Sequence, residues 1–172
     1  IEITNLKIPE YQRPYKWTIK NVNQLIDDIF LFKNNNSYRF GTIVLHKENK
    51  DNREILNIVD GQQRTITLFL IILSIKNSYK AKEYLEKHKS SSLDIKSKFE
   101  FTNLLSQHNI KQNYQEITRR VKDFDTHIIN FILEKCEVVV VTLSDISEAF
   151  QFFDSQNARG RDLEPHDLLK AF

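Results

Sequence analysis

The chain has 172 residues, of which 40% are hydrophobic and 28% charged, and its formal net charge is +2. These values suit one folded domain with a real core and exclude a disordered, strongly charged chain. A single cysteine excludes an internal disulfide, and the longest apolar stretch, 66–73, is far shorter than the roughly 20 residues of a membrane helix. We therefore expect a cytoplasmic protein with no membrane partner.

The first half of the chain predicts two helices and a hairpin. Residues 8–17 contain two prolines and should be extended, whereas 21–32 place apolar side chains on one helical face, with Asn21 and Gln24 as a capping box. Two strands are predicted at 39–48 and 53–61, and the turn NKDN between them indicates an antiparallel hairpin. The run TITLFLIILSIKNSY, apolar on nearly every side, then predicts a buried helix.

The second half is mainly helical. Residues 76–135 read as helices with a polar break near KSSSLD, and CEVVVVTL, at 136–143, predicts a short buried strand. A helix beginning at Asp145 and Glu148 follows, and Pro165 predicts the first position of another. The chain has no methionine and stops within that last pattern, so we expect a fragment of a longer protein.

Glycine and proline are scarce, with three of each, and five of these six residues lie in or beside three polar clusters. The central cluster, VDGQQRT, lies where a strand gives way to the buried helix. Gly61 lets the backbone turn, and the free N–H groups and dipole of the helix start favour an anion. Arg64 in the first helical turn is unfavourable unless an anion neutralises it, and Gln62 and Gln63 can hydrogen-bond a phosphate, ribose or base. Asp60 could hold a metal ion, position a water or cap the helix; the structural alternative is a cap with an Arg–Asp ion pair.

The first cluster, IPEYQRPYKW, offers Tyr11, Gln12 and Arg13 as ligand contacts, with a planar guanidinium for phosphate and aromatic rings for a base. Tyr15 and Trp17 could equally pack on the core. The third cluster, FFDSQNARGRDLEPHDLLK, has Gly160 as a helix C-terminal cap, beside Asn157 and Arg159 as further ligand contacts. Its structural alternative is a simple helix–turn–helix.

Several chemistries have no support in the sequence. Cys136 precedes four valines and has no neighbouring base, so a buried thiol is expected. The five histidines have no metal-ligand spacing, and neither a Walker-type loop nor a GxGxxG motif is present. Residues 76–122 carry 11 Lys and Arg against 5 Asp and Glu. This excess could meet a nucleic-acid backbone or be a solvated helix face.

Taken in order, IPEYQRPYKW, FGTIVL…IVDGQQRTITL and FFDSQNARGRDLEPHDLLK resemble the N-terminal domain family of GmrSD-type restriction endonucleases, within the ParB/sulfiredoxin-like superfamily. The resemblance runs from about residue 6 to the end. It implies an α+β ParB-like core with a small mixed or antiparallel sheet, a buried helix after the DGQQR turn, and a helical insertion at about 76–135 in a single domain, 1–172. Sulfiredoxin chemistry needs a cysteine where this chain has Gln62 and Gln63, and is excluded.

The resemblance also implies binding and hydrolysis of a nucleoside triphosphate at Asp60–Arg64, within a modification-dependent restriction or anti-phage protein. DNA and a nuclease, in a C-terminal domain or partner subunit, are the further partners that it implies. We expect Asp60, Gln63 and Arg64 to be catalytic, with Mg²⁺ entering with the nucleotide and held by Asp60. The expected nucleotide or phosphate contacts are Tyr11, Gln12, Arg13, Gly61, Gln62, Arg64, Asn157, Arg159 and Gly160. Two alternatives are a non-catalytic module that binds or senses modified DNA, and a nuclease acting at the DGQQR site, although two-metal cleavage usually needs more clustered carboxylates.

Overall fold

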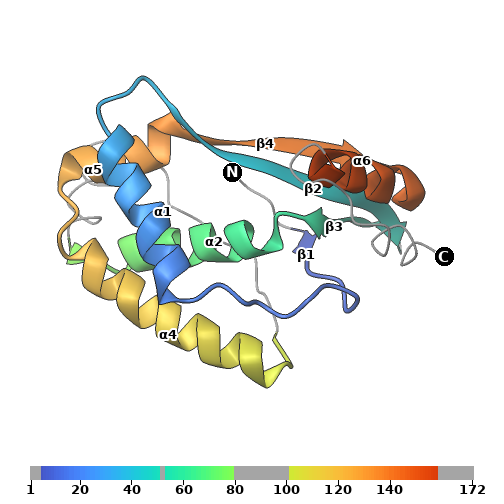
Figure 1. The fold of residues 1–172 in the computed structure, drawn as a ribbon, viewed down its shortest axis with the longest axis horizontal. Helices are drawn as coiled ribbons and strands as arrows, with labels where there is room; N and C mark the ends of the chain where they lie inside the picture. Colours follow the sequence, from blue (N-terminus) through green and yellow to red (C-terminus); the bar gives the residue numbers. More distant parts are fainter. Residues whose placement is uncertain (1–4, 51–52, 80–100, 159–172) are drawn as a thin grey trace.

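A computed structural model describes residues 5–50, 53–79 and 101–158 of the chain. These residues form an α+β fold built on one mixed sheet of order β1-β3-β2-β4 (Figure 1). The strands are β1 (Leu6–Lys7), β2 (Tyr38–Lys50), β3 (Arg53–Asp60) and β4 (Cys136–Leu143). β2 and β3 pair antiparallel, which confirms the predicted hairpin, whereas β1 runs parallel to β3 and β4 parallel to β2.

The largest core lies on one face of this sheet. It is formed with α1 (Ile19–Phe32), α2 (Gln62–Lys76), α4 (Leu104–Val121), α5 (Thr126–Asn130) and the π-helical turn η1 (Phe131–Lys135). Long aliphatic side chains from all of them are buried together, as their apolar spacing predicts. The predicted helices at 21–32 and 65–79 are therefore confirmed as α1 and α2.

The start of α1 differs from the prediction. Its N-cap is Thr18, whose backbone N–H donates to the side-chain Oδ1 of Asn21 at 3.0 Å. Asn21 is thus the N3 residue of the capping box and not its N-cap, and Gln24 takes no part as the reciprocal residue. The sequence pattern was misleading because asparagine fits either end of such a box.

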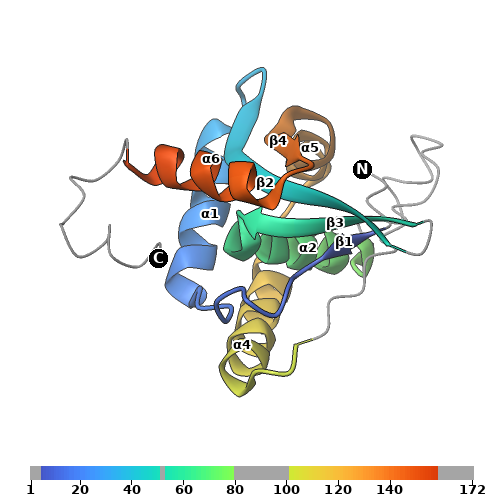
Figure 2. The same cartoon turned by 90° about the vertical axis from the view of Figure 1, so that its right-hand side faces the viewer.

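The opposite face of the sheet is covered by α6 (Ile146–Ala158) (Figure 2). Val44 of β2 and Val59 of β3 form a small separate core with Ala149 of α6. Asp145 caps this helix as predicted, because its Oδ1 accepts hydrogen bonds from the backbone N–H groups of Ser147 at 2.7 Å and Glu148 at 3.2 Å. These hydrogen bonds lower the pKa of the Asp145 carboxyl.

The predicted strand at 136–143 is confirmed as β4, but its predicted burial is wrong, because β4 lies at the edge of the sheet. Val139 and Val140 have exposed fractions of 38% and 44%. A continuous run of β-branched residues is typical of a strand covered on both faces, yet here no described helix covers these two side chains. The predicted polar break at 89–94 and the helix at Pro165 lie outside the described residues.

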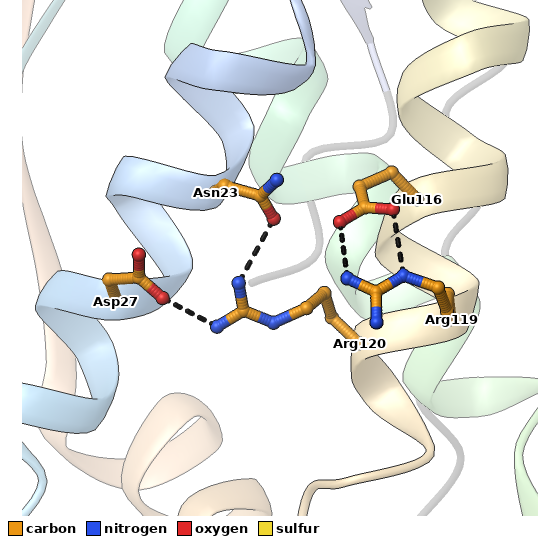
Figure 3. Close-up of polar contacts among 5 residues, drawn as sticks. All are labelled: Asn23, Asp27, Glu116, Arg119 and Arg120. Carbon is orange, nitrogen blue, oxygen red and sulfur yellow. Dashed lines mark hydrogen bonds and ion pairs between the residues drawn. The ribbon is translucent and has the colours of Figure 1, made fainter.

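Helices α1 and α4 are joined by charged side chains (Figure 3). The guanidinium of Arg120 donates to Asp27 at 2.6 Å and to Asn23 at 3.0 Å, and it lies over the ring of Phe30. Its neighbour Arg119 pairs with Glu116 on the same helix at 2.7 Å. No helix in the described part of the chain is long and apolar enough to cross a membrane.

Candidate functional site

One glycine joins β3 to α2. Gly61 has a φ of 88°, a left-handed conformation that glycine adopts without strain. A Cβ added there would lie 3.1 Å from Cγ1 and 3.2 Å from Cα of Ile43, so the start of α2 lies directly against β2. The first intrahelical acceptor is the Gly61 carbonyl, bonded by the N–H of Thr65 at 2.9 Å. The backbone N–H groups of residues 62–64 therefore have no partner within the helix.

Two β-bulges lie beside this turn. The register of β2 and β3 pairs Leu45 with Ile58 but Val44 with Asp60, so β3 carries an extra residue at Val59. The register of β2 and β4 also shifts between Arg39 and Thr42, around Gly41, whose φ is 112°. Bulges redirect side chains and are common next to functional sites. One bulge thus lies at the strand end that carries the acidic residue of the motif, and the other lies one strand away, where β2 pairs with β4.

Arg64 reaches from α2 across to the second bulge. Its Nη1 donates to the carbonyl oxygen of Thr42 at 3.0 Å, and a Cβ on Gly41 would lie 3.0 Å from its Cζ. The guanidinium therefore lies over Gly41, close to the start of α2. Within the described part of the chain Arg64 forms no ion pair with Asp60, so the simple cap with an Arg–Asp pair is not what the structure contains.

The first polar cluster lies against the central one. We call residues 9–18 the arm; it opens with a turn, in which the N–H of Gln12 bonds the Pro9 carbonyl, and not in the fully extended form predicted. The side-chain Nε2 of Gln12 donates to the carbonyl of Val59, the residue at the bulge, at 2.9 Å. This contact brings two sequence clusters, more than forty residues apart, to one place.

Gln63 holds the backbone of the arm. Its Oε1 accepts from the N–H groups of Lys16 at 2.7 Å and Trp17 at 3.1 Å, and its Nε2 donates to the carbonyl of Pro14 at 3.2 Å. The second glutamine of the motif therefore has a structural task that a helix cap does not explain. It fixes the arm beside the first turn of α2.

Tyr15 anchors the arm between α2 and α4. Its side chain is fully buried, and its hydroxyl lies 2.7 Å from Oγ1 of Thr67 and accepts from Nδ2 of Asn113 at 2.9 Å. Its backbone N–H donates to Oγ of Ser106, and its carbonyl accepts from Nδ2 of Asn109. Burial raises the pKa of the Tyr15 hydroxyl, and the bonds to Thr67 and Asn113 oppose that rise.

The other residues of the arm differ in exposure. The ring of Tyr11 is 55% exposed and its centroid lies 5.9 Å from that of Phe150 on α6. Arg13 is exposed, whereas Trp17 is partly buried against the main core. Tyr11 and Arg13 are therefore open to a ligand, while Tyr15 and Trp17 pack on the core, the alternative that the sequence left open for them.

The third cluster is described only at its beginning. Asn157 lies in the last turn of α6, the helix that covers the sheet beside Val59. The side chain of Asn157, and all of Arg159 and Gly160, lie outside the described residues. Their part in the site remains a prediction.

A comparison with protein-family profiles matches residues 1–172, the whole chain, to the family described as GmrSD restriction endonuclease, N-terminal domain. The chain belongs to this family. The resemblance seen in the three polar clusters is thereby confirmed, and the chain is part of the restriction-protein class that carries GmrSD N-terminal domains. Among curated proteins, none matches it significantly.

The acidic side chains of this GmrSD domain suit a magnesium ion held mainly by nucleotide phosphates better than one held in a cage of protein ligands. In the described ranges no three His, Cys, Asp or Glu residues gather as a metal cage. Asp60, at the bulged end of β3, is a single half-exposed carboxylate. Mg²⁺ that is held mainly by nucleotide phosphates needs only one or two carboxylates, so Asp60 suits an ion that arrives with its nucleotide.

Several residues beside the DGQQR segment were not predicted from the sequence. Gly41 and Thr67 fall inside predicted regular elements. Three more residues lie in α4, for which the sequence analysis considered only the excess of positive charge: Ser106, Asn109 and Asn113. Their spacing of three and four residues, with small polar side chains on one helical face, was the available signal.

Cys136 of the GmrSD domain is expected to be nearly inert towards alkylation. It is a free thiol at the start of β4, half-buried and not fully buried as expected, and this burial raises its pKa from 9.0 to about 12. Only the thiolate reacts, so near pH 8 the native chain should react with iodoacetamide on the order of a thousandfold more slowly than the chain in urea. Mass spectrometry of timed samples measures both rates, and rapid labelling of native protein contradicts the raised pKa.

Proposed function

We propose that this domain binds a nucleoside triphosphate with Mg²⁺ at the junction of β3 and α2 and hydrolyses it. In this proposal the domain regulates a nuclease carried by another domain or subunit of a DNA-restriction system. The observation that supports it best is the position of Arg64: a guanidinium lies at a helix start whose first amide groups have no intrahelical partner. A bound anion resolves the unfavourable pairing of a cation with the positive helix end.

The residues of the site have separate roles in phosphate binding, in holding the metal or the water, and in positioning the arm. The phosphates lie over Gly61 and the N–H groups of the first turn, with Arg64 and Arg13 neutralising their charge. Gln62 is only 7% exposed, so it contributes its backbone N–H and not its side chain. Asp60 would hold the Mg²⁺ or orient the attacking water. Magnesium, when present, neutralises negative charge on the phosphate oxygens.

Gln63 has a different role from the catalytic one that the sequence favoured. Both ends of its amide are engaged with the backbone of the arm. Its contribution to hydrolysis is therefore to position the arm, which presents Gln12, Arg13 and Tyr11. Asn157, Arg159 and Gly160 close the far side of the site, and Tyr11 stacks on the base.

Thermal stabilisation by ATP, GTP, CTP and UTP with Mg²⁺ tests this proposal. A ligand at about 100 times its Kd stabilises a protein by about 2.7 kcal/mol, which raises Tm visibly. Arg13→Ala should reduce the shift caused by the preferred nucleotide, because its guanidinium is exposed on the arm. Lys16→Ala is the matched control, since it removes another exposed cation three residues away and should leave the shift unchanged. Equal shifts in both variants argue against a contact with Arg13, and no shift in the folded wild type argues against the whole proposal.

A DNA-binding module is the second candidate, because 76–122 carries an excess of six positive charges. In α4, however, Arg119 and Arg120 are already paired with carboxylates (Figure 3). Duplex binding that weakens steeply with salt and ignores nucleotide is the result that favours this candidate. The nuclease alternative predicts metal-dependent nicking that Asp60→Ala abolishes.

A further inference from the structure

A buried asparagine on α4 contacts the arm through both hydrogens of its amide. Asn113 is fully buried, and its Nδ2 donates to the hydroxyl of Tyr15 at 2.9 Å and to the carbonyl of Trp17 at 2.8 Å. Its Oδ1 is buried without a hydrogen-bond partner in the described structure. A half-satisfied buried amide costs stability, so its place in the core calls for an explanation other than packing.

The hydrogen bonds that start at Asn113 run in one direction. An amide nitrogen can only donate, so the Tyr15 hydroxyl accepts from Asn113. At the other end Oγ1 of Thr67 donates to the carbonyl of Gln63 at 2.9 Å, so it must accept from Tyr15 at 2.7 Å. Asn113 therefore donates to Tyr15, Tyr15 to Thr67, and Thr67 to the carbonyl of Gln63. Each bond polarises the next in such a chain.

This hydrogen-bond chain ends inside the DGQQR motif. Its last acceptor is the backbone carbonyl of Gln63, and the side chain of the same residue bonds Pro14, Lys16 and Trp17. Asn113 bonds the arm directly at Trp17 as well. The arm segment 14–17 is thus hydrogen-bonded to both α2 and α4. In this network each hydroxyl donates in one direction only.

We propose that Asn113 is a positioning residue of the nucleotide site. It touches no part of the motif itself, but it fixes the arm so that Gln12 reaches the bulge at Val59 and Arg13 faces the phosphates. This inference rests on the proposed function for its ligand, whereas its structural part concerns the arm alone.

The test uses a change that keeps the size of the side chain and reverses its hydrogen bonding. Asn113→Asp places a carboxylate, which accepts and does not donate, against the carbonyl and the hydroxyl that both accept from Asn113 in the wild type. Gln112→Glu makes the same amide-to-carboxylate change at the exposed neighbour on α4 and is the matched control. Trp17 is the only tryptophan in the chain, so its fluorescence reports on the arm directly.

We expect Asn113→Asp to shift Trp17 emission to longer wavelength, to raise its quenching by acrylamide severalfold and to weaken nucleotide Kd about tenfold. Gln112→Glu should keep the acrylamide quenching and the nucleotide Kd within twofold of wild type. If Asn113→Asp does not fold, Thr67→Val breaks the same chain one bond later without adding charge, and the same changes are expected.

The possible results separate this inference from the proposed function. Wild-type quenching and wild-type nucleotide Kd in a folded Asn113→Asp or Thr67→Val variant overturn the positioning role. A wild-type chain that binds no nucleotide overturns the proposed function instead. In that case Trp17 quenching still decides whether Asn113 positions the arm.

Discussion

Replacing Arg64 with alanine is expected to abolish the nucleotide-dependent stabilisation of the domain. The guanidinium is held at the start of α2 by the carbonyl of Thr42, and in the proposed complex it is the cation nearest the free amide groups of the first turn. A stabilisation of about 2.7 kcal/mol at 100 times the wild-type Kd should fall to near zero. Differential scanning fluorimetry with and without the preferred nucleotide measures this loss.

Two controls make the loss of Arg64 interpretable. Arg39→Ala removes an arginine of β2, one that pairs with Glu137 of the edge strand β4, and should leave the nucleotide shift intact. Arg64→Lys keeps the charge but not the planar fork, so an intermediate shift is expected. If nucleotide still stabilises folded Arg64→Ala as strongly as wild type, the phosphates do not lie at this helix start.

Gly61→Ala is expected to cause the largest loss of stability among simple substitutions in the motif. The left-handed conformation at φ 88° costs an alanine about 1–2 kcal/mol. The new Cβ would also meet the backbone of Ile43 at 3.2 Å, and forced contacts of this kind cost about 1–3 kcal/mol more. Urea denaturation followed by circular dichroism gives the free energy of unfolding of both chains.

Gly41→Ala provides the comparison, because φ there is also positive, at 112°. The atom that its Cβ would meet is the end of the Arg64 side chain, which can move. The cost of Gly41→Ala should therefore shrink in an Arg64→Ala background, whereas the cost of Gly61→Ala should persist there. Equal stability of Gly61→Ala and wild type would mean that the strand and helix do not meet as described.

The sequence predicted those parts of the fold that depend on local patterns. The hairpin followed from two apolar runs around NKDN, and α1 and α2 followed from the spacing of their aliphatic residues. The start of α6 followed from Asp145 and Glu148. At the start of α1 several residues suit the N-cap position, and the prediction of Asn21 in place of Thr18 was wrong.

What the sequence could not predict depends on contacts between distant segments. The edge position of β4 is set by strand order, which leaves no trace in a run of four valines. The pairing of β1 with β3 involves only two residues of β1, too few for a recognisable pattern. Likewise, the contacts of Gln63 with the arm could not be predicted, because nothing local indicates that residue 63 lies against residues 14–17.

The span of the contacts around Tyr15 also has a consequence for biosynthesis. The partners of this residue on α4 lie 91, 94 and 98 positions later in the chain. Because the ribosome makes the chain from its N-terminus, the arm is synthesised long before the helix that locks it in place. The hairpin and α2 can form during translation, but the arm stays untethered on one side until α4 has emerged. A nascent chain therefore has its DGQQR motif before it has a completed site.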